Sequence, residues 1–363
     1  MKKKMLALAM SFACMIMILT GCGSSSENED KDGNGYADEL YLYNWSEYMI
    51  PEILEDFEKE YGIKVVETVY ESNDEMLAKL LTGSEGEFDI AVPTNFFIGA
   101  LIENDLLEPF DEGAITNLDN IYKDYLDLDY DKGNKYTVPY MGTAMLTIGN
   151  TKKLEELGVE IKKAEDLLNE KLKDNVVVVD DNEAITNLAM MGLDMDPSKK
   201  DVKSLKNSKK FLMDLNKNVK SYAQVADGRT MLARNEIAAA YIYSGDSVQA
   251  MNENKDLEIV MKESPVSLSI DNFVLLKGSR HKKEAQLFID FVLRPENYAK
   301  LEEEFAYVCL NEAAVEKLPQ ELAQNPACVL DAEMKANLFL IGEKSEEVLS
   351  ETTDLVTEVK SAK

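Results

Sequence analysis

Aromatic and acidic side chains recur at the ends of short apolar runs in this sequence. The only tryptophan of the chain, Trp45, follows the run "LYLY". Similar residues follow "FDIAVP", "VVVV" and "AAAYI", and others stand at the opening of "NFVLL". The candidate residues at these positions are Trp45, Tyr48, Thr94, Asn95, Phe96, Asp180, Asp181, Glu183, Tyr243, Ser269 and Asp271.

This combination of side chains suits a cationic ligand that also has an apolar body. Ammonium groups bind to carboxylates and to the faces of aromatic rings. Methylene chains pack against flat apolar walls, and a linear polyamine has both parts. An anion would instead need arginine, lysine or helix N-termini directed at it. A sugar also accepts rings and carboxylates, so a polyol ligand remains an alternative.

Signatures of catalysis are missing from the sequence, which has no nucleophile elbow, HExxH, Walker loop or GxGxxG motif. The single histidine, His281, lies among basic residues in "SRHKKEA", which predicts a solvated helix entry. Asp180 and Asp181 are adjacent, and neighbouring side chains on a strand point to opposite faces. We therefore predict a binding protein that is not an enzyme and that has no cofactor or metal. A secreted hydrolase with an Asp/Glu pair and a lipoprotein adhesin are remote alternatives.

Strand-like and helix-like segments alternate along the chain, which predicts an α/β fold with mostly parallel strands. The run "IPEILEDFEKEY" has apolar residues at helical spacing, and "SNDE" before the next apolar run is a capping-box pattern. About 340 residues remain after the leader, which exceeds one comfortable core and predicts two domains. In open α/β sheets, ligands bind beyond the carboxyl ends of the strands, where the candidate residues lie.

The N-terminus resembles the leader of a bacterial lipoprotein. Residues 1–21 combine "MKKK" with a short apolar run, and "LTGC" ends at Cys22, which would become the lipid-bearing residue. Residues 22–37 then read as a flexible acidic tether. They include the start of "DKDGNGYADELY", which resembles a calcium loop but has Tyr41 where a bidentate glutamate is needed. We therefore predict a linker there, with calcium binding as the alternative.

The composition is strongly acidic. Residues 1–21 carry three lysines and no acidic residue, so their removal takes the formal net charge from −29 to −32. Such acidity disfavours nucleic acid and anionic membrane surfaces as partners. It is compatible with a cationic ligand, although solvated helix faces account for most of the carboxylates.

Six segments together resemble the spermidine/putrescine-binding proteins of bacterial ABC importers. They are "YNWSEYMIPEILEDFEKEYGIKV", "YESNDEMLAKL", "FDIAVPTNFF", "YTVPYM", "AAYIYSGD" and "FAYVCLN", in order from Leu40 to Asn311. The resemblance implies a two-domain periplasmic-binding-protein fold (type II-like), whose ligand cleft lies between domains joined by crossing strands. It assigns residues 38–144 and 270–315 to domain 1, and residues 145–269 and 316–363 to domain 2. It also implies a lipid-anchored, extracytoplasmic monomer that delivers a polyamine to a membrane permease.

The resemblance also implies ligand residues, with some departures. Trp45, Tyr48, Thr94, Asp271 and Tyr307 match family positions in kind. Phe96 stands in place of a tyrosine and Tyr243 in place of a tryptophan. At the acidic strand end, either Asp181 is the amine ligand, or Asp180 and Glu183 form the pair. Ser269 replaces a tryptophan, and a glutamine expected near Leu338 is missing. We therefore expect a preference for a shorter diamine, or weaker spermidine binding than is typical of the family.

Two further cysteines, Cys309 and Cys328, remain in the mature chain. An extracytoplasmic setting would permit them to form a disulfide, and closing a loop of that size could contribute about 3 kcal/mol. Two unpaired, half-buried thiols are the alternative.

Overall fold

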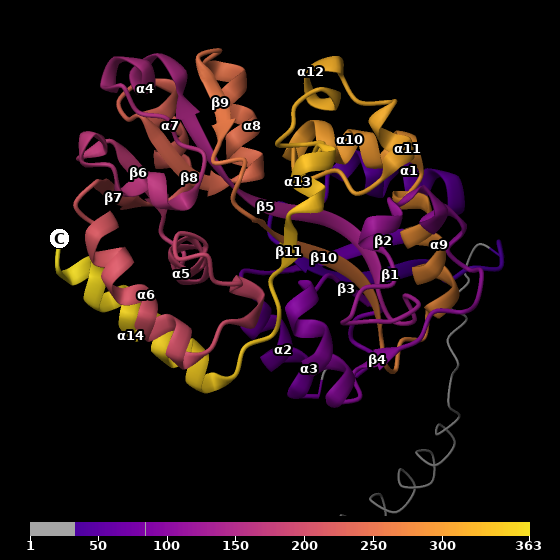
Figure 1. Ribbon diagram of the computed structural model, residues 1–363. Coiled ribbons are helices and arrows are strands. Elements are labelled where there is room, and N and C mark those ends of the chain that lie inside the picture. The colour runs from indigo at the N-terminus through magenta and orange to yellow at the C-terminus, as the bar shows by residue number, and fades with distance from the viewer. Residues whose placement is uncertain (1–32, 84) are drawn as a thin grey trace, which may run out of the picture.

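The computed structural model describes residues 33–83 and 85–363 as two α/β lobes joined by long strands (Figure 1). One continuous sheet, in the order β2-β1-β3-β10-β5-β8-β6-β7, runs through both lobes. Its first three strands belong to the first lobe and its last three to the second lobe. The predicted α/β fold with two lobes is therefore confirmed.

The first lobe is built on parallel pairing of β1 (Glu39–Trp45) with β2 (Lys64–Tyr70) and β3 (Ile90–Ala91). The helix α1 (Pro51–Tyr61) begins at a proline and ends at Gly62 in the left-handed conformation, which suits a residue without Cβ. The helix α2 (Asn73–Leu81) begins after Ser72, whose side chain accepts a hydrogen bond from the Glu75 amide, as the capping pattern predicted. The lobe is completed by α3 (Ile98–Glu103) and β4 (Leu107–Glu108).

The second lobe places β6 (Val176–Val179) between β7 (Val219–Ala223) and β8 (Ala239–Tyr243), all parallel. The other elements of this lobe are α4 (Thr151–Leu157), α5 (Asn182–Met191), α6 (Val202–Leu215), α7 (Val225–Ala233), α8 (Ser244–Glu253) and β9 (Leu257–Val260). The helix α8 begins at Ser244, directly after the end of β8. The small side chain of Ser244 fits here because it is fully buried beside the backbone of β5.

Two long strands cross from one lobe to the other. The first half of β5 (Val138–Asn150) pairs with β10, and its second half pairs with β8 and β9. The start of β10 (Val266–Leu276) pairs with β5 and with β11 (Leu338–Leu340), and its end pairs with β3 and β4. The register of β10 against β5 shifts between Asp271 and Asn272. A bulge of this kind re-aims the side chains next to it.

The chain after β10 returns to the first lobe before it crosses again. Two helices follow, α9 (Lys282–Val292) and α10 (Pro295–Phe305), and Pro295 is the first residue of the second, where a proline is tolerated. After α11 (Glu312–Val315), α12 (Gln320–Ala323) and α13 (Ala332–Ala336), β11 leads to α14 (Glu346–Ser361). The last helix packs on α5 and α6 of the second lobe (Figure 1).

The domain boundaries given by the resemblance stay a prediction. The segment with α12 and α13 lies beside α10 and α11 (Figure 1), and the Cys309 amide donates to the Cys328 carbonyl at 2.8 Å. At the boundary between the predicted tether and domain 1, Tyr36 packs on the hydrophobic core and the Ala37 amide donates a hydrogen bond to the Glu284 carboxylate.

The predicted solvated helix entry at His281 is wrong, because its side chain is only 12% exposed. His281 Nδ1 lies 3.0 Å from Asp89 Oδ2, and Ser279 donates to the other carboxylate oxygen at 2.7 Å. Burial alone would raise the pKa of Asp89, but the hydrogen bonds with His281 and Ser279 hold it below its ordinary value. The histidine therefore helps to satisfy a buried carboxylate.

The remaining sequence features have mixed outcomes. Cys309 and Cys328 are free and buried, and burial raises the pKa of both thiols. Tyr41, at the last position of the calcium-like loop, lies in β1, whereas the first residues of that loop and Cys22 lie outside the described residues. Within residues 33–83 and 85–363, no helix combines the length and the apolar character that a membrane span requires.

Candidate binding cavity

A cavity of about 640 Å³ lies where the crossing strands meet the two lobes. It is lined by every candidate residue from the sequence except Asp180 and Asn95. The candidates that line it are Trp45, Tyr48, Thr94, Phe96, Asp181, Glu183, Tyr243, Ser269, Asp271 and Tyr307. These residues come from both lobes and from β10, so the fold brings together side chains that are far apart in the sequence.

Asp271 occupies the bulge of β10 and faces the cavity. Its two carboxylate oxygens accept hydrogen bonds from the Tyr48 hydroxyl at 2.8 Å and from the Thr94 hydroxyl at 2.6 Å. Thr94 is itself held by Asn73 of α2, which bonds to its amide and its hydroxyl. Burial raises the pKa of Asp271 to about 6, although the two hydroxyl groups favour the ionised form. The carboxylate therefore has two hydrogen-bond donors, but it forms no ion pair with any residue of the described ranges 33–83 and 85–363.

The carboxylate from the second lobe is Asp181. It is the N-cap of α5: Oδ1 accepts from the Ala184 amide at 2.6 Å, and Oδ2 accepts from the Tyr243 hydroxyl at 3.0 Å. Asp180, the preceding residue, is exposed and pairs with Lys360 of α14 instead. The opposed directions expected for these neighbours are therefore observed.

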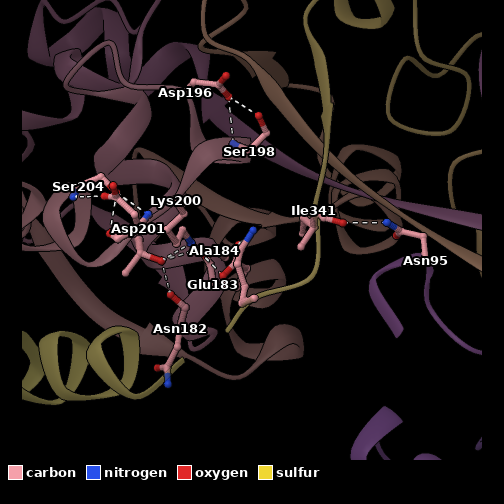
Figure 2. Close-up of polar contacts among 12 residues, drawn as sticks. Asn95, Asn182, Glu183, Ala184, Asp196, Ser198, Lys200, Asp201, Ser204 and Ile341 are labelled. Carbon is pink, nitrogen blue, oxygen red and sulfur yellow. Dashed lines mark hydrogen bonds and ion pairs between the residues drawn. The ribbon is translucent and has the colours of Figure 1, made fainter. Parts of the chain in front are cut away.

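Glu183 also faces the cavity, but its carboxylate is already paired. Lys200 Nζ lies 2.9 Å from Glu183 Oε2, and the Lys200 side chain is completely buried. Figure 2 shows the two residues next to each other, on α5 and on the segment before α6. Sequence reasoning did not identify Lys200, because nothing in the run "PSKKDVKS" separates it from its solvated lysine neighbours.

Aromatic side chains form the apolar part of the cavity wall. Trp45 is half-buried; its indole nitrogen donates to the Val92 carbonyl at 2.9 Å, and its ring lies 4.8 Å from that of Tyr70. Tyr48 and Tyr307 meet edge to face with ring centroids 5.4 Å apart. The hydrogen bond and the ring contacts fix these side chains, so they offer flat surfaces of defined orientation.

Asn95 has a different place. Its Oδ1 accepts from the Ile270 amide at 3.0 Å, and its Nδ2 donates to the Ile341 carbonyl at 2.7 Å. It thereby ties the first lobe to β10 and to the segment that follows β11 (Figure 2). This side chain braces the crossing segments and does not line the cavity.

The structure adds cavity residues that the candidate set lacked. They include Glu71, Asp246, Thr143, Met145 and Ile341. The sequence already places Asp246 with Tyr243 at the end of β8, three residues after that strand, although it was not among the predicted ligand residues. Thr143 and Met145 lie inside a strand, and Ile341 comes from a crossing segment that only the folded chain reveals.

Comparison with known proteins identifies the family. The model of the family "Bacterial extracellular solute-binding protein" matches residues 52–329. The chain is 30% identical over 302 residues, 83% of each chain, to the spermidine/putrescine-binding periplasmic protein 1 of Haemophilus influenzae. It is also 30% identical over 338 residues to the putrescine/cadaverine-binding protein of Pseudomonas aeruginosa, covering 89% of this chain and 94% of that protein.

Solved structures agree with this assignment. The spermidine/putrescine ABC transporter substrate-binding protein PotD of Streptococcus pneumoniae superposes with a TM-score of 0.79 at 28% identity, covering 90% of this chain and 99% of that chain. A putative spermidine/putrescine ABC transporter protein of Listeria monocytogenes gives 0.75 at 29% identity, with 90% of this chain and 100% of that chain covered. The two-domain fold of substrate-binding proteins, expected from the sequence resemblance, is therefore confirmed. The chain belongs to the family of bacterial extracellular solute-binding proteins.

Proposed function

We propose that this protein captures a short linear diamine outside the cytoplasm and delivers it to an ABC importer permease. The observation that carries the proposal is a pair of carboxylates, Asp271 and Asp181, that line one cavity with aromatic rings beside them. Within the described part of the chain, no lysine or arginine forms an ion pair with either carboxylate. A ligand with two ammonium groups would supply the missing charges through charge-assisted hydrogen bonds.

The relatives support the ligand class, since they are named as binding proteins for spermidine, putrescine or cadaverine. They also support a role in binding without catalysis. The proposal includes attachment to the cell membrane through a lipid on Cys22, action as a monomer, and an extracytoplasmic location. These points rest on the sequence of the N-terminus and on the family.

The preference for a short diamine rests on the cavity wall. Ser269 lines the cavity where the family resemblance expects a tryptophan, and its hydroxyl lies 3.4 Å from the Thr143 carbonyl. Each methylene group that is moved out of water contributes only about 0.8 kcal/mol and needs a wall to cover it. A diamine with fewer methylene groups needs less aromatic surface to cover it, so the absence of a ring at position 269 costs it less affinity.

The proposal is tested by titration calorimetry with putrescine, cadaverine, spermidine and spermine, and with a hexose as the polyol control. We expect saturable binding of unmodified putrescine or cadaverine at one site per chain. Binding of the hexose alone would support the polyol alternative and overturn the proposal. Chemical change of the bound amine would show an enzyme instead.

The fluorescence of Trp45 provides a second test. Because this residue is the only tryptophan of the chain and lines the cavity, its emission reports on that wall alone. We expect saturating putrescine to shift or quench the emission. A Trp45→Phe variant should lose the signal and retain most of the affinity. An unchanged emission spectrum in the presence of bound ligand would place the ligand away from this ring.

Ser269→Trp tests the reason for the chain-length preference. The added indole would cover part of a longer chain, so we expect spermidine affinity to rise relative to putrescine by roughly tenfold, about the worth of one ring contact. The measurement is a paired titration of the variant and of wild type with both amines. Ser269→Ala is the matched control and should leave the ratio unchanged. Wild-type protein that binds spermidine tenfold more tightly than putrescine would contradict the argument.

A further inference from the structure

The cavity contains more carboxylates than a diamine can use. Five line it: Glu71, Asp181, Glu183, Asp246 and Asp271. Glu71 is exposed to solvent. Asp246 lies 3.9 Å from an Arg229 nitrogen, and Glu183 lies 2.9 Å from Lys200. Among the described residues, Asp181 and Asp271 are not exposed and form no ion pair, although Lys200 interacts with Asp181 electrostatically.

Specific contacts with the protein fix the position of the Lys200 side chain. Its side chain is completely buried, and Nζ donates to the Thr186 hydroxyl at 2.7 Å as well as contacting the Glu183 carboxylate (Figure 2). Burial lowers the pKa of Lys200 to about 8, and Glu183 opposes that shift, so the ammonium group stays charged near neutral pH. An internal cation is thus held against the cavity wall by the protein itself.

A second lysine approaches the same carboxylate from another segment. Lys344, between β11 and α14, has its ammonium 4.0 Å from Glu183 Oε1 and a side chain only 9% exposed. Glu183 therefore lines the cavity while two protein cations approach its two carboxylate oxygens. Asp181, the N-cap of α5, lines the same cavity and stands two residues before Glu183.

We propose that Lys200 limits the charge of the ligand by neutralising Glu183, so that the cavity accepts a dication and discriminates against trications. This inference rests on the proposed function and names the determinant of its ligand class. In a longer polyamine, the ammonium group beyond Asp181 would need a further carboxylate. Among the acidic residues that line the cavity, Glu183 is the nearest in sequence to Asp181, and it already forms an ion pair with Lys200.

The test compares Lys200→Met with Lys199→Met by calorimetry against putrescine and spermidine. Methionine retains most of the apolar volume of lysine and removes the charge. We expect Lys200→Met to raise the ratio of spermidine to putrescine affinity by about tenfold, since the Glu183 carboxylate then loses its nearer cation and keeps only Lys344, 4.0 Å away. Lys199, whose side chain is 82% exposed and pairs with Asp196, is the matched control, and its variant should keep the wild-type ratio.

The double variant Lys200→Met/Glu183→Gln separates charge from packing. It removes both charges, so we expect the ratio to return to within about threefold of wild type. If Lys200→Met alone does not fold, Glu183→Gln replaces it: the unpaired Lys200 charge should then weaken spermidine more than putrescine.

The outcomes distinguish this inference from the proposed function. If wild type binds putrescine and the ratio of spermidine to putrescine affinity is the same in Lys200→Met and in Lys199→Met, the role of Lys200 is overturned. The proposed function would then stand. A ratio that stays high in the double variant would attribute the effect to packing and would also overturn it. A wild-type protein that binds neither amine would overturn the proposed function and this inference with it.

Discussion

Asp271→Asn is expected to weaken diamine binding by at least about a hundredfold, because removing one partner of a buried, hydrogen-bonded charge pair typically costs about 2–5 kcal/mol. The change is nearly isosteric, and the Tyr48 and Thr94 hydroxyl groups can still bond to the amide. Calorimetry with putrescine measures the loss. A tenfold effect or less would place Asp271 outside the contacts made by the ligand.

The same substitution should not destabilise the ligand-free protein at neutral pH. Burial raises the pKa of Asp271 to about 6, above the value of about 3.9 in an unfolded chain. The folded state therefore holds the ionised carboxylate at a cost above about pH 6, and that cost disappears as the pH falls toward about 4. We expect Asp271→Asn to be more stable than wild type by about 1–3 kcal/mol near pH 7.5 and equal to it near pH 4, as measured by urea unfolding.

The side chains that interact with Asp271 do not titrate in the same pH range as its carboxylate. The neighbours that interact with it electrostatically are the hydroxyl groups of Tyr48, Tyr70, Tyr130, Tyr140 and Tyr307. Because these groups stay neutral below pH 9, wild-type binding should weaken about tenfold between about pH 7 and pH 5, where a proton must leave before the cation binds. For the stability prediction, an Asp271→Asn protein that unfolds at lower urea concentration than wild type at neutral pH would contradict it. Such a result would show that the hydrogen bonds from Tyr48 and Thr94 to the carboxylate outweigh the cost of burying its charge.

Asp181→Asn is expected to weaken diamine binding by about 30-fold or more, again through the loss of one paired charge. Asparagine caps a helix as well as aspartate does, so α5 should keep its N-terminus. The substitution therefore removes the charge and retains the fold. A monoamine such as butylamine, which cannot pair with both carboxylates, should lose affinity in only one of the two variants, Asp181→Asn and Asp271→Asn.

The neighbouring residue provides the control for this prediction. Asp180 is exposed and pairs with Lys360 outside the cavity, so Asp180→Asn should change putrescine affinity by no more than about threefold, as befits an exposed ion pair. Equal losses in Asp180→Asn and Asp181→Asn would indicate a general effect of net charge and would contradict the assignment of Asp181 to the ligand.

The sequence could predict those site residues that follow directly from strand ends. Trp45 ends the strand β1, and Thr94 and Asp181 come shortly after β3 and β6, at the edge of the sheet where side chains converge. Their prediction needed only periodicity and the direction of the strands. The capping pattern at Ser72 was equally local, since one side chain and one amide three residues apart define it.

Features that depend on contacts between distant segments could not be predicted. The exposure of His281 depends on Asp89, which is far from it in the sequence. Glu183 is neutralised because Lys200 is buried beside it, whereas the adjacent Lys199 is exposed. Which of these two lysines points inward depends on the packing around α5 and α6. Asp271 was predicted from the opening of a strand and from the family resemblance, whereas it lies inside β10, and the bulge that aims it is a property of the pairing between β5 and β10.

The third crossing, through β11, places the end of the chain on the lobe opposite to β1. Asn34 donates to the Tyr61 carbonyl at the end of α1, whereas Lys363 lies beside the Val219 carbonyl of β7. Any hinge movement between the lobes therefore changes the separation of these two positions. A donor dye near Asn34 and an acceptor dye near Lys363 would convert this family fold into an optical sensor for its own ligand. Neither label would touch the cavity, so the readout would leave the chemistry of recognition unaltered.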